Sequence, residues 1–176
     1  MDNGARLNAG MYGNTDQASK SRTNLWLQTL SYMDGGTLDA QAGSWLRWTG
    51  SAFAPSNRVT LWLSRDGGSN WVALVTNLVA TNGQYYYQNT STNDPSSLFA
   101  RWKVTLEGYS PEVASQTPTN FSYKNGAYTY FVNDNSRSND VWCTAVGNDG
   151  NLGVSEGSPM ASLAALLLRY ELKPGD

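Results

Sequence analysis

Short runs of alternating apolar and polar residues, separated by turn residues, constrain the fold of this 176-residue chain more than any other feature. Asp-Gly-Gly at 34–36 and 66–68 and Asn-Gly at 82–83 and 125–126 mark the turns. These residues favour tight turns because they tolerate the backbone angles that such turns require. Short alternating runs between such turns predict antiparallel strands rather than long helices.

The clearest alternation lies in residues 58–65 and 98–107, where every second residue is apolar. We expect those residues to face the core and the residues between them, Trp62 included, to face outward. A Pro/Ser/Thr-rich connection follows at 109–120. The other expected strands are 24–33, 37–49, 70–76, 84–89, 127–132, 140–146 and 162–172. This pattern predicts an all-β, antiparallel β-sandwich, either a jelly roll or an immunoglobulin-like Greek key.

The two ends of the chain differ from the middle. Residues 1–22 are polar and without periodicity, which predicts an extended N-terminal arm before a single sandwich domain at 23–176. As a strand, 162–172 would be apolar on both faces over its first half, so we expect that half to be covered on both sides. A helix at 159–168 is the alternative, because Ala and Leu favour helices.

The absence of histidine narrows the chemistry of the chain. It excludes a Ser-His-Asp triad, a Cys-His pair and any His-based zinc site. The one cysteine, Cys143, shares a face with Val141 and Ala145 in an expected strand, which predicts a small buried hydrophobe. No phosphate loop or nucleophile elbow occurs, and most acidic residues lie in turns. We therefore expect no catalysis, and a two-carboxylate glycosidase is only the third hypothesis.

Calcium is the one metal that the sequence leaves open. Asp134, Asp140 and Asp149 lie in Asn/Asp-rich segments that offer oxygen ligands. Neither segment has the EF-hand spacing, so we interpret both as hairpin loops and expect no cofactor.

Charge and hydropathy exclude two classes of partner. The net charge is −2 and no basic run occurs, so we expect no binding to nucleic acid. The longest apolar stretch, 160–168, is too short to span a membrane. Residues 1–4 do not begin a basic region followed by an apolar one, so no secretory signal is visible. We expect synthesis and assembly in a cytoplasm, unless a signal has been removed.

Residues 58–104 carry a motif in three successive parts: Ser64-Arg65-Asp66-Gly67-Gly68-Ser69-Asn70-Trp71 after one strand, Asn82-Gly83-Gln84-Tyr85 before the next, and the strand with Ala100-Arg101-Trp102. The pattern resembles that of immunoglobulin-like sandwich modules in bacterial and fungal surface proteins. The resemblance implies a sandwich whose core Trp71 caps, and a structural or adhesive role. In architecture alone, a His-free β protein with a polar arm is also similar to the decoration or cement proteins of tailed-phage heads.

Seven Trp and ten Tyr, with only 15% charged residues, provide many aromatic side chains for contacts. We expect Trp71 and Trp102 in the core. The candidates for an exposed contact surface are Trp26, Trp62, Tyr86, Tyr128 and Tyr130. Aromatic residues are enriched at the centres of protein interfaces, and their flat faces also bind sugars.

These features predict a non-catalytic structural subunit of a phage virion. Its partners would be copies of itself, or a capsid or other particle protein. The alternative is an extracellular or cell-surface carbohydrate-binding module or adhesin that binds glycan through an aromatic face.

Overall fold

The computed structural model describes residues 25–91, 93–126, 129–170, 172 and 176. The expected arm at 1–22 lies outside the described residues, and so does Tyr128. Strands form most of the regular structure of the described chain, and they build two sheets within residues 26–124. The prediction of an all-β fold is therefore confirmed.

The smaller sheet has three antiparallel strands in the order β1 (Trp26–Thr29), β3 (Ser44–Ser51) and β6 (Gln84–Tyr87). Side chains of a strand alternate between its two faces. Leu46 and Trp48 are therefore buried, whereas Trp45 and Arg47 are exposed on the outer face.

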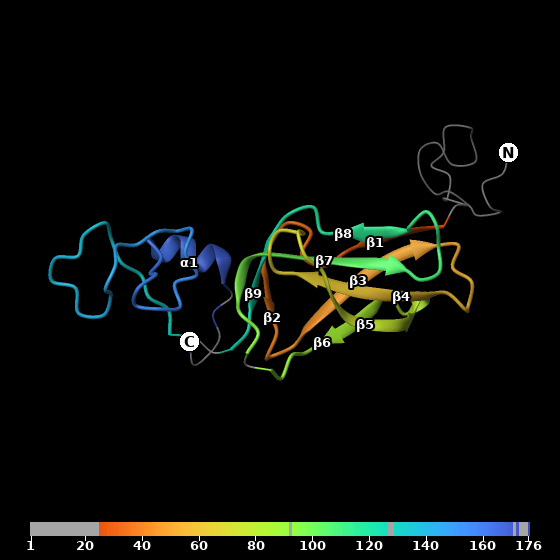
Figure 1. Cartoon of the computed structure of the whole chain (residues 1–176), viewed down its shortest axis with the longest axis horizontal. Helices are drawn as coiled ribbons and strands as arrows, with labels where there is room; N and C mark the ends of the chain where they lie inside the picture. The colour runs from red at the N-terminus through yellow and green to blue at the C-terminus, as the bar shows by residue number, and fades with distance from the viewer. Residues whose placement is uncertain (1–24, 92, 127–128, 171, 173–175) are drawn as a thin grey trace, which may run out of the picture.

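The larger sheet is mixed. Its order is β2 (Thr37–Asp39), β9 (Phe121–Lys124), β7 (Ser97–Leu106), β4 (Arg58–Ser64) and β5 (Val72–Val79), and β8 (Ala114–Gln116) also pairs with β7. Only β2 and β9 run parallel; the other pairs in this sheet are antiparallel. The connection expected at 109–120 thus contains a strand, and β9 was not expected. Figure 1 shows the sheets on one side of the molecule, with α1 beyond β2 and β9.

One hydrophobic core joins the two sheets. It includes Leu46 and Trp48 of the smaller sheet and Leu61, Trp102 and Val104 of the larger sheet. The core-facing positions expected in 58–65 and 98–107 are confirmed, because their apolar side chains are buried. The outward positions are confirmed only in part, because Thr60, Ser64 and Thr105 are buried as well. The expectation that Trp102 lies in the core is also confirmed, since it is fully buried.

Trp71, in contrast, does not lie in the core. Its side chain is half-buried, and Lys103 Nζ lies 4.8 Å from its ring centroid. Lys103 alternates with the buried Trp102 and Val104, so it points to the outer face of the larger sheet. Trp71 therefore packs under a lysine on that outer face, and the expectation that it caps the core is wrong.

The chain after β9 differs most from the sequence prediction. The strands expected at 140–146 and 162–172 are wrong, and the described part of 127–132 contributes only a single bridge from Val132 to Met160. Residues 163–169 form α1 (Leu163–Arg169) instead, as the helical alternative expected. The Ser162 side chain begins the helix by accepting a hydrogen bond from the Ala165 N–H.

A second, smaller hydrophobic cluster holds α1 in place. Leu166 and Tyr170 pack with Met160 and with Leu98 of β7. The Thr37 hydroxyl also donates a hydrogen bond to the Arg169 carbonyl at 2.6 Å. Within the described residues, no helix has the length and apolar character needed to cross a membrane.

Candidate functional site

Trp62 lies on the outer face of β4, as its alternation predicted. Its Nε1–H donates to Thr105 Oγ1 at 2.8 Å, and Lys103 Nζ lies 5.5 Å from its ring centroid. The lysine therefore covers both Trp62 and Trp71 through cation–π contacts. The Trp62 indole therefore stabilises the larger sheet and leaves little exposed ring surface for a ligand.

Tyr86 lies on the outer face of the smaller sheet, directly opposite Trp45. The two ring centroids are 5.2 Å apart at an interplanar angle of 60°, and both side chains are exposed. The Tyr86 hydroxyl donates to the Ala42 carbonyl at 2.8 Å, which fixes the ring. Trp45 was not among the candidates from sequence. Alternation along β3 nevertheless places it on the same face as the charged Arg47 and on the opposite face from the buried Leu46.

The remaining candidates lie elsewhere. Trp26 is half-buried at the start of β1. Tyr130 is half-buried beyond the sheets, where its ring centroid lies 4.8 Å from that of Tyr170. The described candidates thus do not form one surface: Trp62 and Tyr86 occupy opposite sheets, and Tyr130 belongs to the second cluster.

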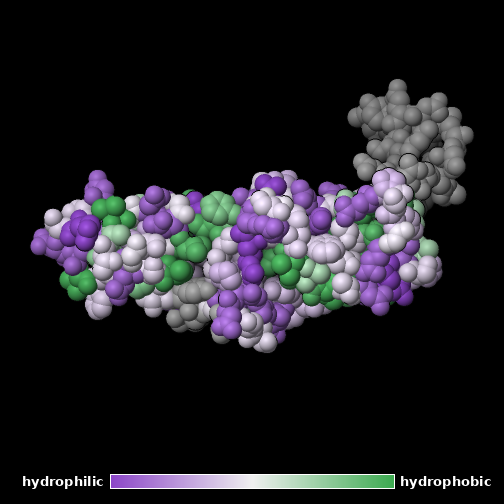
Figure 2. Space-filling model, in the orientation of Figure 1, coloured by the Kyte–Doolittle hydropathy of each residue, from purple (hydrophilic) through white to green (hydrophobic). Residues whose placement is uncertain are grey.

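Helix α1 exposes an apolar face that the sequence did not single out. Leu163, Leu167 and Leu168 are 58%, 56% and 84% exposed, whereas Leu166 is buried. Residues three or four apart lie on the same side of a helix, so Leu163 and Leu167 are neighbours. In Figure 2, hydrophobic residues reach the surface in the region of α1. The helix is therefore apolar on both sides but covered on only one.

The loop at 132–147 adds further exposed apolar residues. Val141 and Trp142 are 81% and 75% exposed, because this segment forms turns and not the strand expected from its sequence. Cys143 is half-buried, and its burial together with the nearby Asp140 and Glu156 carboxylates raises the pKa of its thiol. We call the exposed leucines Leu163, Leu167 and Leu168 of α1 together the C-terminal apolar surface.

A pocket of about 240 Å³ opens on the larger sheet. Leu63, Val72 and Leu74 supply its apolar lining, and Arg65 and Asp94 supply an ion pair at 3.1 Å. This pocket therefore combines a short apolar wall with fixed charges.

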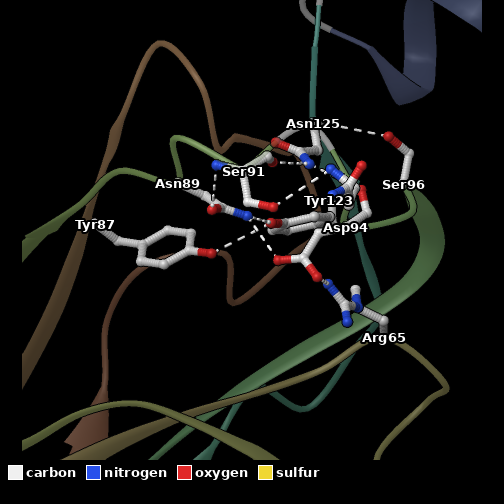
Figure 3. Close-up of polar contacts among 9 residues, drawn as sticks. Arg65, Tyr87, Asn89, Ser91, Asp94, Ser96, Tyr123 and Asn125 are labelled. Carbon is white, nitrogen blue, oxygen red and sulfur yellow. Dashed lines mark hydrogen bonds and ion pairs between the residues drawn. The ribbon is translucent and has the colours of Figure 1, made fainter.

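A hydrogen-bond network backs this pocket (Figure 3). Asn89 Nδ2 donates to Asp94 Oδ2 at 2.7 Å and to Tyr123 Oη at 3.1 Å. Asn125 Nδ2 donates to the carbonyls of Ser91 and Asp94, both at 2.8 Å. The segment between β6 and β7 is thereby held against β9, so the network has a clear structural role.

Two titratable groups of the pocket have shifted pKa values. Hydrogen bonds from the Ser64 hydroxyl, the Asn70 side chain and the Asn70 N–H lower the pKa of Asp66 to about 2. Burial, followed by the hydrogen bond with Tyr123, raises the pKa of Tyr87. Asp66 is thus ionised and Tyr87 protonated at neutral pH, and neither is poised to exchange protons as a general acid or base.

The carboxylates considered for calcium are engaged in local hydrogen bonds. Asp134 Oδ1 accepts from the Ser136 N–H, and Asp140 Oδ2 accepts from Asn133 Nδ2, both at 2.7 Å. Asp149 Oδ1 accepts from the N–H groups of residues 161 and 162. Across the described ranges, no three His, Cys, Asp or Glu side chains gather where they could hold a metal ion.

Comparison with known proteins gives no family for this chain: no protein-family model matches it, and no curated protein matches it.

Proposed function

We propose that this chain is a non-catalytic structural subunit that assembles with copies of itself through the C-terminal apolar surface. The observation that carries the proposal is the exposed side of α1, where Leu163, Leu167 and Leu168 face solvent. A helix that is apolar on all sides is normally covered on all sides. A second copy of the chain would provide the missing cover.

The energetics favour several residues acting together. Complete burial of one Leu or Val side chain stabilises by about 1.5–3 kcal/mol. Association costs at least about 4 kcal/mol in translational and rotational freedom, so one leucine is insufficient. Burial of the three exposed leucines of α1 together can offset this cost.

Charge permits contact between identical copies. Arg169 is the one charged residue of α1, and the whole chain has a net charge of −2. Copies can therefore approach without strong mutual repulsion.

We also propose an immunoglobulin-like topology in preference to a jelly roll. The strand orders β1-β3-β6 and β9-β7-β4-β5 support it, because β4 and β7 are neighbours although β5 and β6 separate them in the chain. In an immunoglobulin-like sandwich strands A, B and E share one sheet and strands G, F, C and C′ share the other, and this matching order supports the choice over a jelly roll.

We propose the virion of a tailed phage as the place of assembly, on the architectural likeness to head decoration and cement proteins. Many identical copies on a particle would make a modest interface effective through multivalency. The residues 1–22, if they form an arm, would add a contact with a neighbouring capsid or other particle protein.

Co-purification tests the self-assembly. A tagged full-length chain is mixed with untagged chain and captured by its tag. We expect it to retain untagged wild-type chain but not the triple variant Leu163→Gln, Leu167→Gln, Leu168→Gln, since glutamine preserves helix propensity while removing the apolar face.

The control is the double variant Val72→Gln and Phe99→Gln. These residues are 60% and 54% exposed on the larger sheet, so the control also removes exposed apolar groups. Retention of the triple variant, or an equal loss in the control, would contradict the proposed interface.

A further inference from the structure

An open hollow that the proposed assembly does not use is lined by β2 of the larger sheet, by β3 of the smaller sheet and by the loops that precede these strands. Its volume is about 400 Å³, and Asp39, Ser44, Trp45 and Arg47 are among its lining residues. This volume lies within the range of roughly 300–1,000 Å³ that small-molecule sites occupy. It can therefore accommodate a sugar ring.

Trp45 gives the hollow a flat apolar wall. Its side chain is 45% exposed, and its indole N–H makes no hydrogen bond to the described residues. Tyr86 packs against the ring from the opposite strand, and its hydroxyl is anchored on Ala42. The indole is thus held in place with both ring surface and a donor group available, unlike that of Trp62 under Lys103.

The backbone near the hollow is held by short hydrogen bonds. The Ser31 hydroxyl donates to the Trp45 carbonyl at 3.0 Å and accepts from the Arg47 N–H at 2.9 Å. Asp39 Oδ1 accepts from the Ala42 N–H at 2.9 Å. The loop before β3 and the strand itself are therefore fixed on both sides of Trp45.

Opposite charges line the hollow. Asp39 supplies an acceptor and Arg47 supplies donors, and the two form no ion pair with each other in the described structure. A phosphate or sulfate would meet the Asp39 carboxylate, and an ammonium group would meet the Arg47 guanidinium. A neutral ligand with several hydroxyl groups and one apolar face fits this combination best.

We propose that the hollow binds a pyranose unit of a neutral glycan. The sugar ring stacks on the Trp45 indole, because the C–H face of a pyranose is apolar. Asp39 accepts hydrogen bonds from its hydroxyl groups and Arg47 donates to them. The lining of the hollow comes from β2, β3 and the loops before them and includes no residue of α1, so binding does not depend on the proposed self-assembly.

A glycan array of neutral oligosaccharides tests this site. It displays α- and β-linked glucose, galactose, mannose and N-acetylglucosamine oligomers, and the full-length wild-type chain is applied to it. Multivalent display makes even a weak single site detectable. We expect binding to at least one oligosaccharide, and an array without any binding would overturn the proposal.

Titration of that oligosaccharide then assigns the site. We expect Trp45→Ala to weaken binding at least about tenfold, the loss typical of removing an aromatic anchor. Trp45→Tyr restores part of the affinity, which separates ring stacking from a general loss of folding. Asp39→Asn also weakens binding, whereas Trp62→Ala leaves it within about twofold of wild type, since Trp62 does not line the hollow.

Unchanged binding in Trp45→Ala, or equal losses in Trp45→Ala and Trp62→Ala, would overturn the assignment. The triple glutamine variant of α1 distinguishes the two proposals, because it should bind the oligosaccharide as well as wild type even if it no longer assembles.

Discussion

The hydroxyl oxygens of Tyr87 and Tyr123 lie 3.2 Å apart in a hydrogen bond that joins the two sheets. Tyr87 belongs to β6 of the smaller sheet, and Tyr123 belongs to β9 of the larger sheet. Asn89, after β6, also donates to the Tyr123 hydroxyl. The contact therefore links the core to the network behind the pocket.

Removing the Tyr87 hydroxyl and removing the Tyr123 hydroxyl should reduce the free energy of unfolding by unequal amounts. Tyr87→Phe leaves the Tyr123 hydroxyl paired with Asn89, so we expect a loss of about 1 kcal/mol in the free energy of unfolding. Tyr123→Phe removes the partner of the buried Tyr87 hydroxyl, so we expect a larger loss, about 1–3 kcal/mol. Urea denaturation of both variants measures the difference, and a smaller loss in Tyr123→Phe would contradict the described geometry.

Alkaline pH should weaken the fold through Tyr87. The pKa of Tyr87 is raised by burial and then by its hydrogen bond with Tyr123, so the folded state favours the protonated form. The contribution of Tyr87 to the free energy of unfolding is complete below the pKa of tyrosine in the unfolded chain, about 10. It is lost as the pH rises above that value. Tyr87→Phe should therefore reduce the fall in unfolding free energy above pH 10. Identical pH profiles for wild type and Tyr87→Phe would argue against this contribution.

Acid should weaken the turn between β4 and β5 through Asp66. The folded pKa of Asp66 is about 2, because Ser64 and Asn70 donate hydrogen bonds to its carboxylate. The ionised Asp66 carboxylate therefore stabilises the fold fully above the pKa of aspartate in the unfolded chain, near 4. This stabilisation is lost as the pH falls toward 2. We expect Asp66→Asn to be less stable than wild type at neutral pH and to lose less stability over this range. Thermal unfolding as a function of pH measures both, and an unchanged profile would count against the described hydrogen bonds.

Gly43 should tolerate no side chain. It has a positive φ of 87°, and a Cβ there would lie 2.1 Å from the Tyr86 hydroxyl oxygen. We expect Gly43→Ala to cost about 1–3 kcal/mol, from backbone strain and displacement of the Tyr86 ring. Gly67→Ala is the matched control, because Gly67 has a φ of 75° but open space around its Cβ position. Equal losses in the two variants, measured by urea denaturation, would show that contact with Tyr86 is unimportant.

The strands with one buried face were predictable from sequence, because a register shift would expose every apolar side chain. This is why Trp102 and the alternation of β7 were identified. Trp71 was misplaced because it follows a turn, where alternation no longer says which face a side chain takes. Its position depends on Lys103, which is distant in the sequence.

The C-terminal segment could not be assigned by periodicity, because residues 163–168 are apolar at every position. The Ser162 cap was the available local signal for a helix. Trp45 could have been identified from the phase it shares with Arg47 on β3. Which aromatic rings remain open cannot be deduced from sequence, since it depends on tertiary neighbours such as the Lys103 that covers Trp62.

Sedimentation velocity of the full-length chain over a dilution series tests the proposed self-assembly most directly. We expect a species at least twice as heavy as the 19.2 kDa chain, which dissociates on dilution and is absent from the triple glutamine variant of α1. A wild-type chain that sediments as a 19.2 kDa monomer at every concentration would contradict the proposal.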